Sequence, residues 1–299
     1  MTAEAPPSVR FVAEVSSNHQ RDLDRALKFV DRAAEIGCDG VKFQLFRIDQ
    51  LFAPEILRKS PVHRARREWE LPETFIAPIA RHCKRREIQF GCTPFYLGAV
   101  DALAPHVDFL KIASYELLWD DLLVACAQSG LPLVLSTGMA TLDEVRHAVE
   151  IIESAGGREL TLLHCVSGYP APASAANLGA IDTLAALNDP ASPLQIASGW
   201  SDHTVEPGVI QRAVHAHPTE MVEFHLDLEG QGAEFEAGHC WLPFDMQETI
   251  AQVRVGHRAE GQSAKRPVAL ESEERSWRAD PSDGLRPLIS LRHDWSPGA

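Results

Sequence analysis

The feature that most constrains the fold is an eightfold alternation of short apolar segments with amphipathic segments of helical period. The amphipathic segments include residues 22–37, 141–157 and 243–257, and several begin with a capping Asp or Thr. Parallel strands need a helix to cross between them, so this alternation predicts an α/β fold of the (β/α)8 TIM-barrel class. The eight apolar segments have strand length and lie at residues 11–15, 40–46, 88–95, 109–114, 132–138, 160–166, 194–199 and 221–228.

A doubly wound open sheet is the alternative with the same alternation. It more often carries a glycine-rich turn after its first strand, and "EVSSNHQ" at residues 14–20 contains no GxGxxG pattern. We therefore expect one barrel catalytic domain at residues 1–259 and a polar, proline-containing tail at residues 260–299. The connection at residues 47–87 is longer than usual and is expected to form a loop over the site.

Charge and composition limit the partners. The 28 Lys and Arg against 42 Asp and Glu give a net charge of −14, which disfavours binding to nucleic acid or to acidic membranes. Residues 1–10 contain no apolar signal-peptide core, and no apolar run is long enough to span a bilayer, so we expect a cytoplasmic protein. An anionic ligand would need local positive charge. The basic segment 58–68 is either a solvated element or a region that steers such a ligand.

Polar residues stand at the carboxyl end of every predicted strand, where barrels of this class place their catalytic groups. Lys42 and Lys111 lie inside apolar strands, where an unpaired ammonium group costs several kcal/mol. One such lysine is more often half of a structural ion pair, whereas two on separate strands favour an anion pocket. Strand-end hydroxyls would complete a cradle for phosphate and carboxylate, from Thr93, Ser114, Ser136 and Ser201.

His203 and His225 follow the seventh and eighth predicted strands, which are neighbours in a closed barrel. Their rings would lie about 5 Å apart, one strand spacing. Two imidazoles with open coordination positions suit a divalent metal, with Asp202 or Glu223 as orienting partners. Two unrelated hydrogen-bonded histidines are the alternative, and the spacing alone does not decide between them. His239 is either a third ligand or a loop histidine.

Six colinear motifs occur between residues 11 and 259. They are "AEVSSNHQRDLDRALKFVDRAAEIGCDGVKFQLF", "GCTPFYLGAVDAL", "FLKIASYEL", "LVLSTGMATLDEV", "LLHCVSGYPAPASAANLGAI" and "GWSDHT". Together they resemble the barrel of the N-acetylneuraminate (sialic acid) synthase family. The resemblance implies condensation of phosphoenolpyruvate with a sugar aldehyde to give a 2-keto-3-deoxy acid and phosphate. It also implies a homodimer and a divalent metal, with manganese expected first and magnesium or cobalt as alternatives.

The same resemblance implies three groups of site residues at matching positions. His203 and His225 would hold the metal. The catalytic and acceptor-binding groups would be Glu14, Glu116 and Tyr169, together with Asn18, Gln44 and Glu236, the last standing where an acceptor-binding aspartate is expected. Phosphoenolpyruvate would be bound by Lys42, Thr93, Lys111, Ser114, Ser136, Ser201 and Ser167, where the family often has Asn at the Ser167 position.

The sequence departs from the family pattern in two places. Family members append a small antifreeze-like domain whose arginine contacts the acyl group, and we expect no such domain in this chain. Either the tail, with Arg278 and Arg286, covers the site or the acceptor lacks that acyl group. In "EFHLDLEGQGAEFEAGHCW", at residues 223–241, Phe224 replaces a lysine. Acceptor identity is therefore the least constrained part of the prediction.

Other functions remain as alternatives. The same chemistry could act on a non-acylated or phosphorylated sugar, or on a nucleoside aldehyde of specialised metabolism. A phosphorylated acceptor would require a second basic cluster near the mouth, which only segment 58–68 provides. A metal-dependent hydrolase is less favoured, because the first predicted strand carries no HxH motif. A non-catalytic binding barrel would leave the polar strand ends without a purpose.

Overall fold

The computed structural model describes residues 9–292 and residue 296. The chain divides into two compact units, Met1–His257 and Arg258–Ala299. This division falls two residues before the domain boundary expected from the sequence. Residues 1–8, on which the expected absence of a signal peptide partly rests, lie outside the described residues.

The first unit is built on parallel strands that follow one another in chain order. The strand β1 pairs with β2 on one side and with β8 on the other, which closes the sheet into a barrel. The (β/α)8 prediction is confirmed, and the open doubly wound sheet is excluded because its first and last strands would not pair. The strands are β1 (Arg10–Glu14), β2 (Gly40–Leu45), β3 (Gln89–Pro94), β4 (Phe109–Ile112), β5 (Leu133–Ser136), β6 (Glu159–Cys165), β7 (Gln195–Asp202), β8 (Met221–Leu226) and the short β9 (Cys240–Trp241) beside β8.

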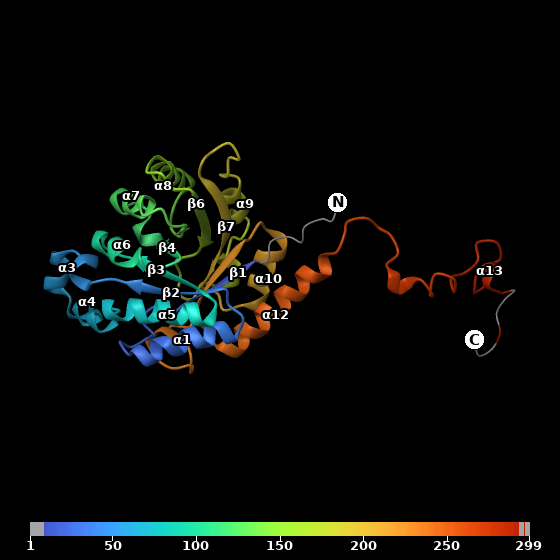
Figure 1. The fold of residues 1–299 in the computed structure, drawn as a ribbon, viewed down its shortest axis with the longest axis horizontal. Helices are drawn as coiled ribbons and strands as arrows, with labels where there is room; N and C mark the ends of the chain where they lie inside the picture. The colour runs from blue at the N-terminus through green and yellow to red at the C-terminus, as the bar shows by residue number, and fades with distance from the viewer. Residues whose placement is uncertain (1–8, 293–295, 297–299) are drawn as a thin grey trace. The chain divides into compact units, whose positions relative to one another are not determined.

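Helices surround the strands on the outside of the barrel (Figure 1). In α1 the apolar residues recur every three to four positions, so one face packs on the sheet. The helix starts where the Asp22 carboxylate accepts a hydrogen bond from the Arg25 amide at 3.0 Å. The α-helices are α1 (Leu23–Glu35), α2 (Ile48–Leu51), α3 (Pro54–Lys59), α4 (Pro61–Ala65), α5 (Ile76–Arg86), α6 (Leu97–Leu103), α7 (Asp120–Gln128), α8 (Leu142–Ser154), α9 (Ala180–Ala185), α10 (Pro207–Ala216), α11 (Ala233–Glu236) and α12 (Pro243–Glu260).

The barrel interior has an apolar lower layer and a polar upper layer. The lower layer is a separate cluster of buried side chains, formed by Val12, Phe109, Val134, Leu163 and Met221. Side chains alternate along a strand, so the residue two positions further points to the same interior. Those residues are Glu14, Lys111, Ser136, Cys165 and Glu223. A Cβ on Gly91 would lie 2.1 Å from the Phe109 ring, so glycine leaves the room that this ring occupies.

The connection between β2 and β3 is the long one that the sequence predicts. It contains α2, α3, α4 and α5 with two 3₁₀ turns, η1 (Arg66–Trp69) and η2 (Glu73–Phe75). It brings Arg66 and Trp69 to the wall of the cavity described below.

The second unit contains η5 (Ala269–Glu271) and α13 (Ile289–Arg292). No residue from 258 to 292 is buried. None of the helices in the described residues combines the length and the apolar character needed to cross a bilayer.

Candidate active site

A cavity of about 410 Å³ opens at the carboxyl end of the barrel strands. It brings together residues from all eight strands or the loops that follow them. Of the residues predicted from the sequence, the wall contains Glu14, Lys42, Gln44, Thr93, Lys111, Ser114, Ser136, Tyr169, Ser201, His203 and His225. The wall also contains Glu223 and His239, which the sequence offered only as an orienting partner and as an alternative third ligand. The residues with no predicted site role include Ser16, Arg66, Trp69, Cys165 and Glu234.

Lys42 is held by carboxylates. Its ammonium group forms an ion pair with Glu14, lies 3.9 Å from Glu223 and donates to the Thr93 hydroxyl at 3.1 Å. Burial lowers the pKa of Lys42 to about 8, although the carboxylate of Glu223 opposes this. The structural ion pair, which the sequence left open for such a lysine, is therefore formed at Lys42. Its charge is largely balanced before any ligand binds.

Lys111 differs from Lys42 in the groups that contact its ammonium group. Its ammonium group is almost fully buried and donates to the Ser136 hydroxyl at 2.7 Å and to the Ile112 carbonyl at 3.0 Å. It forms no ion pair with a carboxylate of the described residues. Burial opposes ionisation of Glu223, but the charges of Lys111 and Lys42 hold the pKa of that carboxyl below its usual range. Lys111 is thus a buried cation that no carboxylate contacts directly.

A small polar recess adjoins Lys111, at the turn that follows β5. The Gly138 amide donates to the Ser114 hydroxyl at 3.0 Å, and that hydroxyl lies 3.2 Å from the Cys165 sulfur. A Cβ on Gly138 would lie 2.4 Å from Ser167 Oγ and 2.9 Å from Ser114 Oγ. Ser167 Oγ is buried and has no hydrogen-bond partner among the described residues. Glycine is needed at position 138 because the backbone there packs directly against these side chains. The part of the recess that opens to the cavity is lined by Ser114 and Ser136, whereas Gly138 and Ser167 do not line the cavity.

Three imidazoles and one phenol gather at the opposite side of the cavity. The ring centroids of His203 and His225 lie 5.4 Å apart, and those of His225 and His239 lie 4.7 Å apart. Tyr169 stacks on His203 with centroids 4.2 Å apart. His203 Nδ1 donates to the Val166 carbonyl at 2.8 Å, which leaves Nε2 with its lone pair. The pairing of His203 with His225 is as the sequence predicts, and His239 joins it.

The donor set at this cluster fits a divalent metal. Ligand atoms of His225, Glu234, His239 and Cys240 lie within 4.8 Å of one another. Three buried atoms lack a hydrogen-bond partner, namely His225 Nδ1, Glu234 Oε2 and His239 Nδ1. Two ligands of one metal, each at about 2.1 Å, cannot be much more than 4 Å apart, so this spacing is near what coordination requires. Burial raises the pKa of the Cys240 thiol to about 12, which makes it the weakest ligand of the four.

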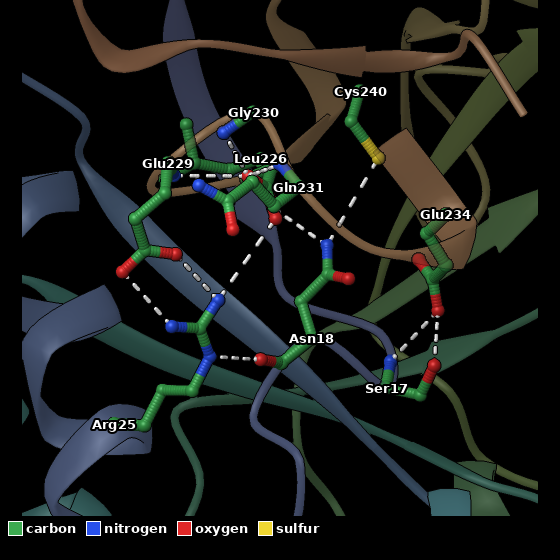
Figure 2. A network of polar contacts seen from close by, with 10 residues as sticks. Ser17, Asn18, Arg25, Leu226, Glu229, Gly230, Gln231, Glu234 and Cys240 are labelled. Atoms are coloured by element: carbon green, nitrogen blue, oxygen red, sulfur yellow. Dashed lines mark hydrogen bonds and ion pairs between the residues drawn. The ribbon is translucent and has the colours of Figure 1, made fainter. Parts of the chain in front are cut away.

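The loop that carries Glu234 and His239 is fastened to the loop after β1, as Figure 2 shows. Glu234 accepts hydrogen bonds from the Ser16 hydroxyl at 2.8 Å and from the Ser17 amide at 3.0 Å. Arg25 forms a bidentate pair with Glu229 at 2.9 and 2.8 Å. The side-chain amide of Asn18 donates to the Leu226 carbonyl at 3.0 Å, so Asn18 positions this loop.

Four predicted residues do not line this cavity, namely Asn18, Glu116, Ser167 and Glu236, and Ser167 lies next to Gly138. Asn18 is engaged as described above. Glu236 is exposed and does not line the cavity, whereas Glu234, two residues earlier, does. Glu116 lines a second hollow of about 530 Å³ that shares part of its wall with the first. Burial raises the pKa of Glu116 to about 7, and its Oε2 atom has no hydrogen-bond partner.

Sequence reasoning gave no site role to Glu234 or Arg66. Both positions follow from loop conformation, and the only signal for Glu234 was its place in the short acidic stretch after β8. Arg66 belongs to the basic segment 58–68, which was considered as a steering region only. Glu223 was considered as an orienting partner of the metal ligands, whereas in the structure it accepts from the Ser201 hydroxyl at 3.1 Å and lies beside Lys42.

The closed parallel barrel carries lysines, hydroxyls and a histidine cluster at the carboxyl ends of its strands. This arrangement is typical of a (β/α)8 enzyme. The NeuB family model matches residues 29–265, and the chain belongs to this family. An N,N'-diacetyllegionaminic acid synthase of Legionella pneumophila is 32% identical over 306 residues, covering 96% of this chain and 81% of that protein. An uncharacterized protein of Methanocaldococcus jannaschii is 32% identical over 264 residues, covering 88% of this chain and 75% of that protein.

A solved structure of similar fold comes from Leptospira borgpetersenii serovar Hardjo-bovis. It is an N-acetylneuraminic acid (sialic acid) synthetase in complex with citrate, with a TM-score of 0.77 and 29% sequence identity. The similarity covers 89% of this chain and 90% of that one. The family resemblance drawn from the sequence motifs is confirmed.

Proposed function

We propose that this protein condenses phosphoenolpyruvate with the aldehyde of a sugar, giving a 2-keto-3-deoxy sugar acid of the nonulosonic type and releasing phosphate. The observation that carries the proposal is Lys111, a buried cation with no carboxylate partner among the described residues, in a cavity wall that also contains the Ser114 and Ser136 hydroxyls. Family membership supports the same reaction, because relatives are named as synthases of legionaminic, pseudaminic and N-acetylneuraminic acids or phosphates.

Phosphoenolpyruvate carries a phosphate and a carboxylate, and the cavity supplies a cation and several donors for them. Lys111 would contact one anionic group, and the hydroxyls of the cavity wall would take the other. Ser114 and Ser136 line this wall, and Ser167 lies next to Gly138 outside it. Charge-assisted hydrogen bonds of this kind are about twice as strong as neutral ones, and they act here away from bulk water.

Glu116 is better suited than Glu14 to move protons. The carboxylate of Glu14 is paired with Lys42 and accepts from the Ser16 amide at 2.5 Å, so both of its oxygens are engaged. Glu116 has a free oxygen and a pKa of about 7, near the value at which a general acid–base is most effective at neutral pH. Tyr169 stacks on His203 at the cavity wall, and we assign it to positioning the acceptor.

His203 and His225 would hold a divalent metal, with manganese as first choice, and Glu234 and His239 would complete the ligand set. When bound, the metal would act as a Lewis acid toward the aldehyde oxygen. The protein's own part is to fix these ligands. The Val166 carbonyl sets the tautomer of His203, and the Ser16 and Ser17 contacts hold Glu234 in place.

The reaction balances without a redox partner. C3 of the enol phosphate forms a bond to the aldehyde carbon, and the aldehyde oxygen takes up a proton. Water then adds to C2 and loses a proton, for which Glu116 is the proposed base. The tetrahedral C2 breaks its bond to the phosphate oxygen and becomes the ketone. Lys111 stays close to the phosphate or carboxylate throughout and needs no reorganisation.

Lys111→Met tests the proposal, because Met keeps the length of the side chain and removes its charge. We expect the affinity for phosphoenolpyruvate, measured by calorimetry, to fall by about 10- to 150-fold, since charged hydrogen bonds are worth about 1.5–3 kcal/mol. Thr161→Val, inside the same barrel but outside the cavity wall, is the control and should bind as the wild type does. Unchanged affinity in Lys111→Met would contradict the proposed cradle. Phosphate release with a panel of sugar aldehydes then identifies acceptors.

His225→Ala should lose manganese binding, measured with the metal alone by calorimetry or electron paramagnetic resonance. The physical reason is that His225 is central, with rings of both His203 and His239 within 5.4 Å. His215→Ala, on α10, is the matched control and should retain the metal. Retention of wild-type metal affinity in His225→Ala would exclude this ligand set.

A further inference from the structure

Arg66 differs from the other arginines of its segment. Arg58 lies 3.6 Å from Glu55, Arg64 donates to the Leu57 carbonyl at 2.5 Å, and Arg67 pairs with Asp49. The side chain of Arg66 has no hydrogen bond or ion pair with any described residue, and its Nε is buried without such a partner. A buried donor of this kind costs free energy unless a ligand satisfies it.

Aromatic rings fix the guanidinium of Arg66. Its central carbon lies 5.7 Å from the Phe52 ring centroid and 5.1 Å from the Trp69 ring centroid. Such cation–π contacts restrain a guanidinium and leave its N–H groups available as donors. The Arg66 side chain is therefore restrained by two rings, and no described residue accepts a hydrogen bond from it.

Arg66 lines both hollows at the mouth of the barrel. The first hollow contains Lys111 and the hydroxyls proposed to bind phosphoenolpyruvate. The second lacks Lys111 and has Glu116 and Phe52 in its wall, whereas Gln44 and Trp69 line both hollows. Arg66 therefore stands where the two hollows share a wall, and an acceptor that reaches the enol from the second hollow would pass it. Glu234 also lines both hollows; its Oε1 accepts from Ser16 and Ser17, and its Oε2 lies 3.8 Å from His225 Nδ1 in the proposed metal site.

We propose that Arg66 binds an oxyanion, a phosphate or a carboxylate, carried by the acceptor sugar at the end remote from its aldehyde. The planar fork of a guanidinium matches two oxygens of either group. The inference rests on the proposed condensation and specifies its acceptor as an anionic sugar. Through Arg66, one of its four arginines, the 58–68 segment would be part of the binding site.

Matched pairs of sugars test the inference on the full-length enzyme by calorimetry. Arabinose 5-phosphate is compared with arabinose, and glucuronate with glucose, so the two pairs separate a phosphate from a carboxylate. We expect at least one anionic member to bind 10- to 100-fold more tightly than its neutral partner. Arg66→Met should abolish the difference, and Arg66→Lys should restore part of it. Arg67→Met, which removes a neighbouring arginine already paired with Asp49, should leave the preference intact.

Equal affinities within both pairs, no binding of any of the four sugars, or a preference that survives in Arg66→Met would overturn the inference. A tenfold loss of phosphoenolpyruvate affinity in Arg66→Met would also overturn it, because Arg66 would then serve the other substrate. The proposed function is tested by a separate result. It fails if the wild-type enzyme does not bind phosphoenolpyruvate or if Lys111→Met binds it normally. The two failures are therefore distinguishable.

Discussion

The buried lysines and carboxylates of the barrel interior have different roles. Lys42 and Glu14 neutralise each other, and Glu223 lies between the two lysines and interacts electrostatically with both. A buried pair of this kind contributes little net stability, because desolvation offsets most of the attraction. The Lys42–Glu14 pair instead fixes the positions of two buried polar side chains in the cavity wall. Lys111, which has only hydroxyl and carbonyl partners, is left as the cation available to a ligand.

Glu116 gives a pH-dependent prediction at the same scale. Its pKa rises from 4.5 to about 7 because the carboxyl group is buried, so the folded state keeps a proton that the unfolded state has lost between these values. The wild type is therefore penalised as pH rises through 7, and the penalty is absent below about pH 4.5. Glu116→Gln has no charge to bury, so it should be more stable than the wild type at pH 8 by on the order of 2 kcal/mol.

Urea denaturation at pH 8 and at pH 4 measures this difference. The two proteins should have nearly the same free energy of unfolding at pH 4, where the carboxyl is protonated in both states. Glu153→Gln on α8 serves as a control for a general effect of removing a carboxylate. A stability gain of equal size at both pH values would contradict the raised pKa of Glu116.

At the scale of elements, the turn after β5 and the loops after β1 and β8 build the site. The turn after β5 places the Gly138 amide against Ser114, and glycine lets the backbone pack close to Ser167. The loop after β8 is held by hydrogen bonds to residues 16–18, which connect two loops far apart in sequence. Strands of the barrel provide a rigid base for these loops, and the loops supply the ligand-facing groups.

Gly138→Ala should displace the side chains packed against this turn. The added Cβ would lie 2.4 Å from Ser167 Oγ and 2.9 Å from Ser114 Oγ, so these side chains must shift, and Ser114 would leave its place in the cavity wall. We expect phosphoenolpyruvate affinity to fall at least tenfold in calorimetry, together with a loss of stability of about 1–3 kcal/mol from overpacking. Gly179→Ala, where the structure has no heavy atom within 4 Å of the new Cβ, is the matched control. Wild-type affinity in Gly138→Ala would contradict the proposed role of Ser114 in binding phosphoenolpyruvate.

At the scale of the whole molecule, every residue assigned to the site belongs to the first unit. The last buried apolar residue of the described chain is Val253, and residues 258–292 contribute none. Removing residues 262–299 should therefore change phosphoenolpyruvate affinity by less than twofold and leave cooperative thermal unfolding in place. Differential scanning calorimetry and binding calorimetry check this. A tenfold loss of affinity would show that the second unit contributes to the site.

The sequence by itself determined the barrel, the strands and most of the residues at their carboxyl ends. Its eightfold alternation and period-two polarity are local properties, and a side chain at a strand end has its direction fixed by the pleat. His203 and His225 were paired in advance for this reason, since their strands are neighbours in a closed barrel.

Only the tertiary structure decided which groups contact one another. It assigned Lys42 to Glu14 and left Lys111 unpaired, and it brought Glu234 rather than Glu236 to the cavity. It also placed Arg66 between two aromatic rings without a polar partner. These outcomes depend on loop conformations and on contacts between segments far apart in the chain. Such contacts carry no periodic signal, so local sequence patterns cannot specify them.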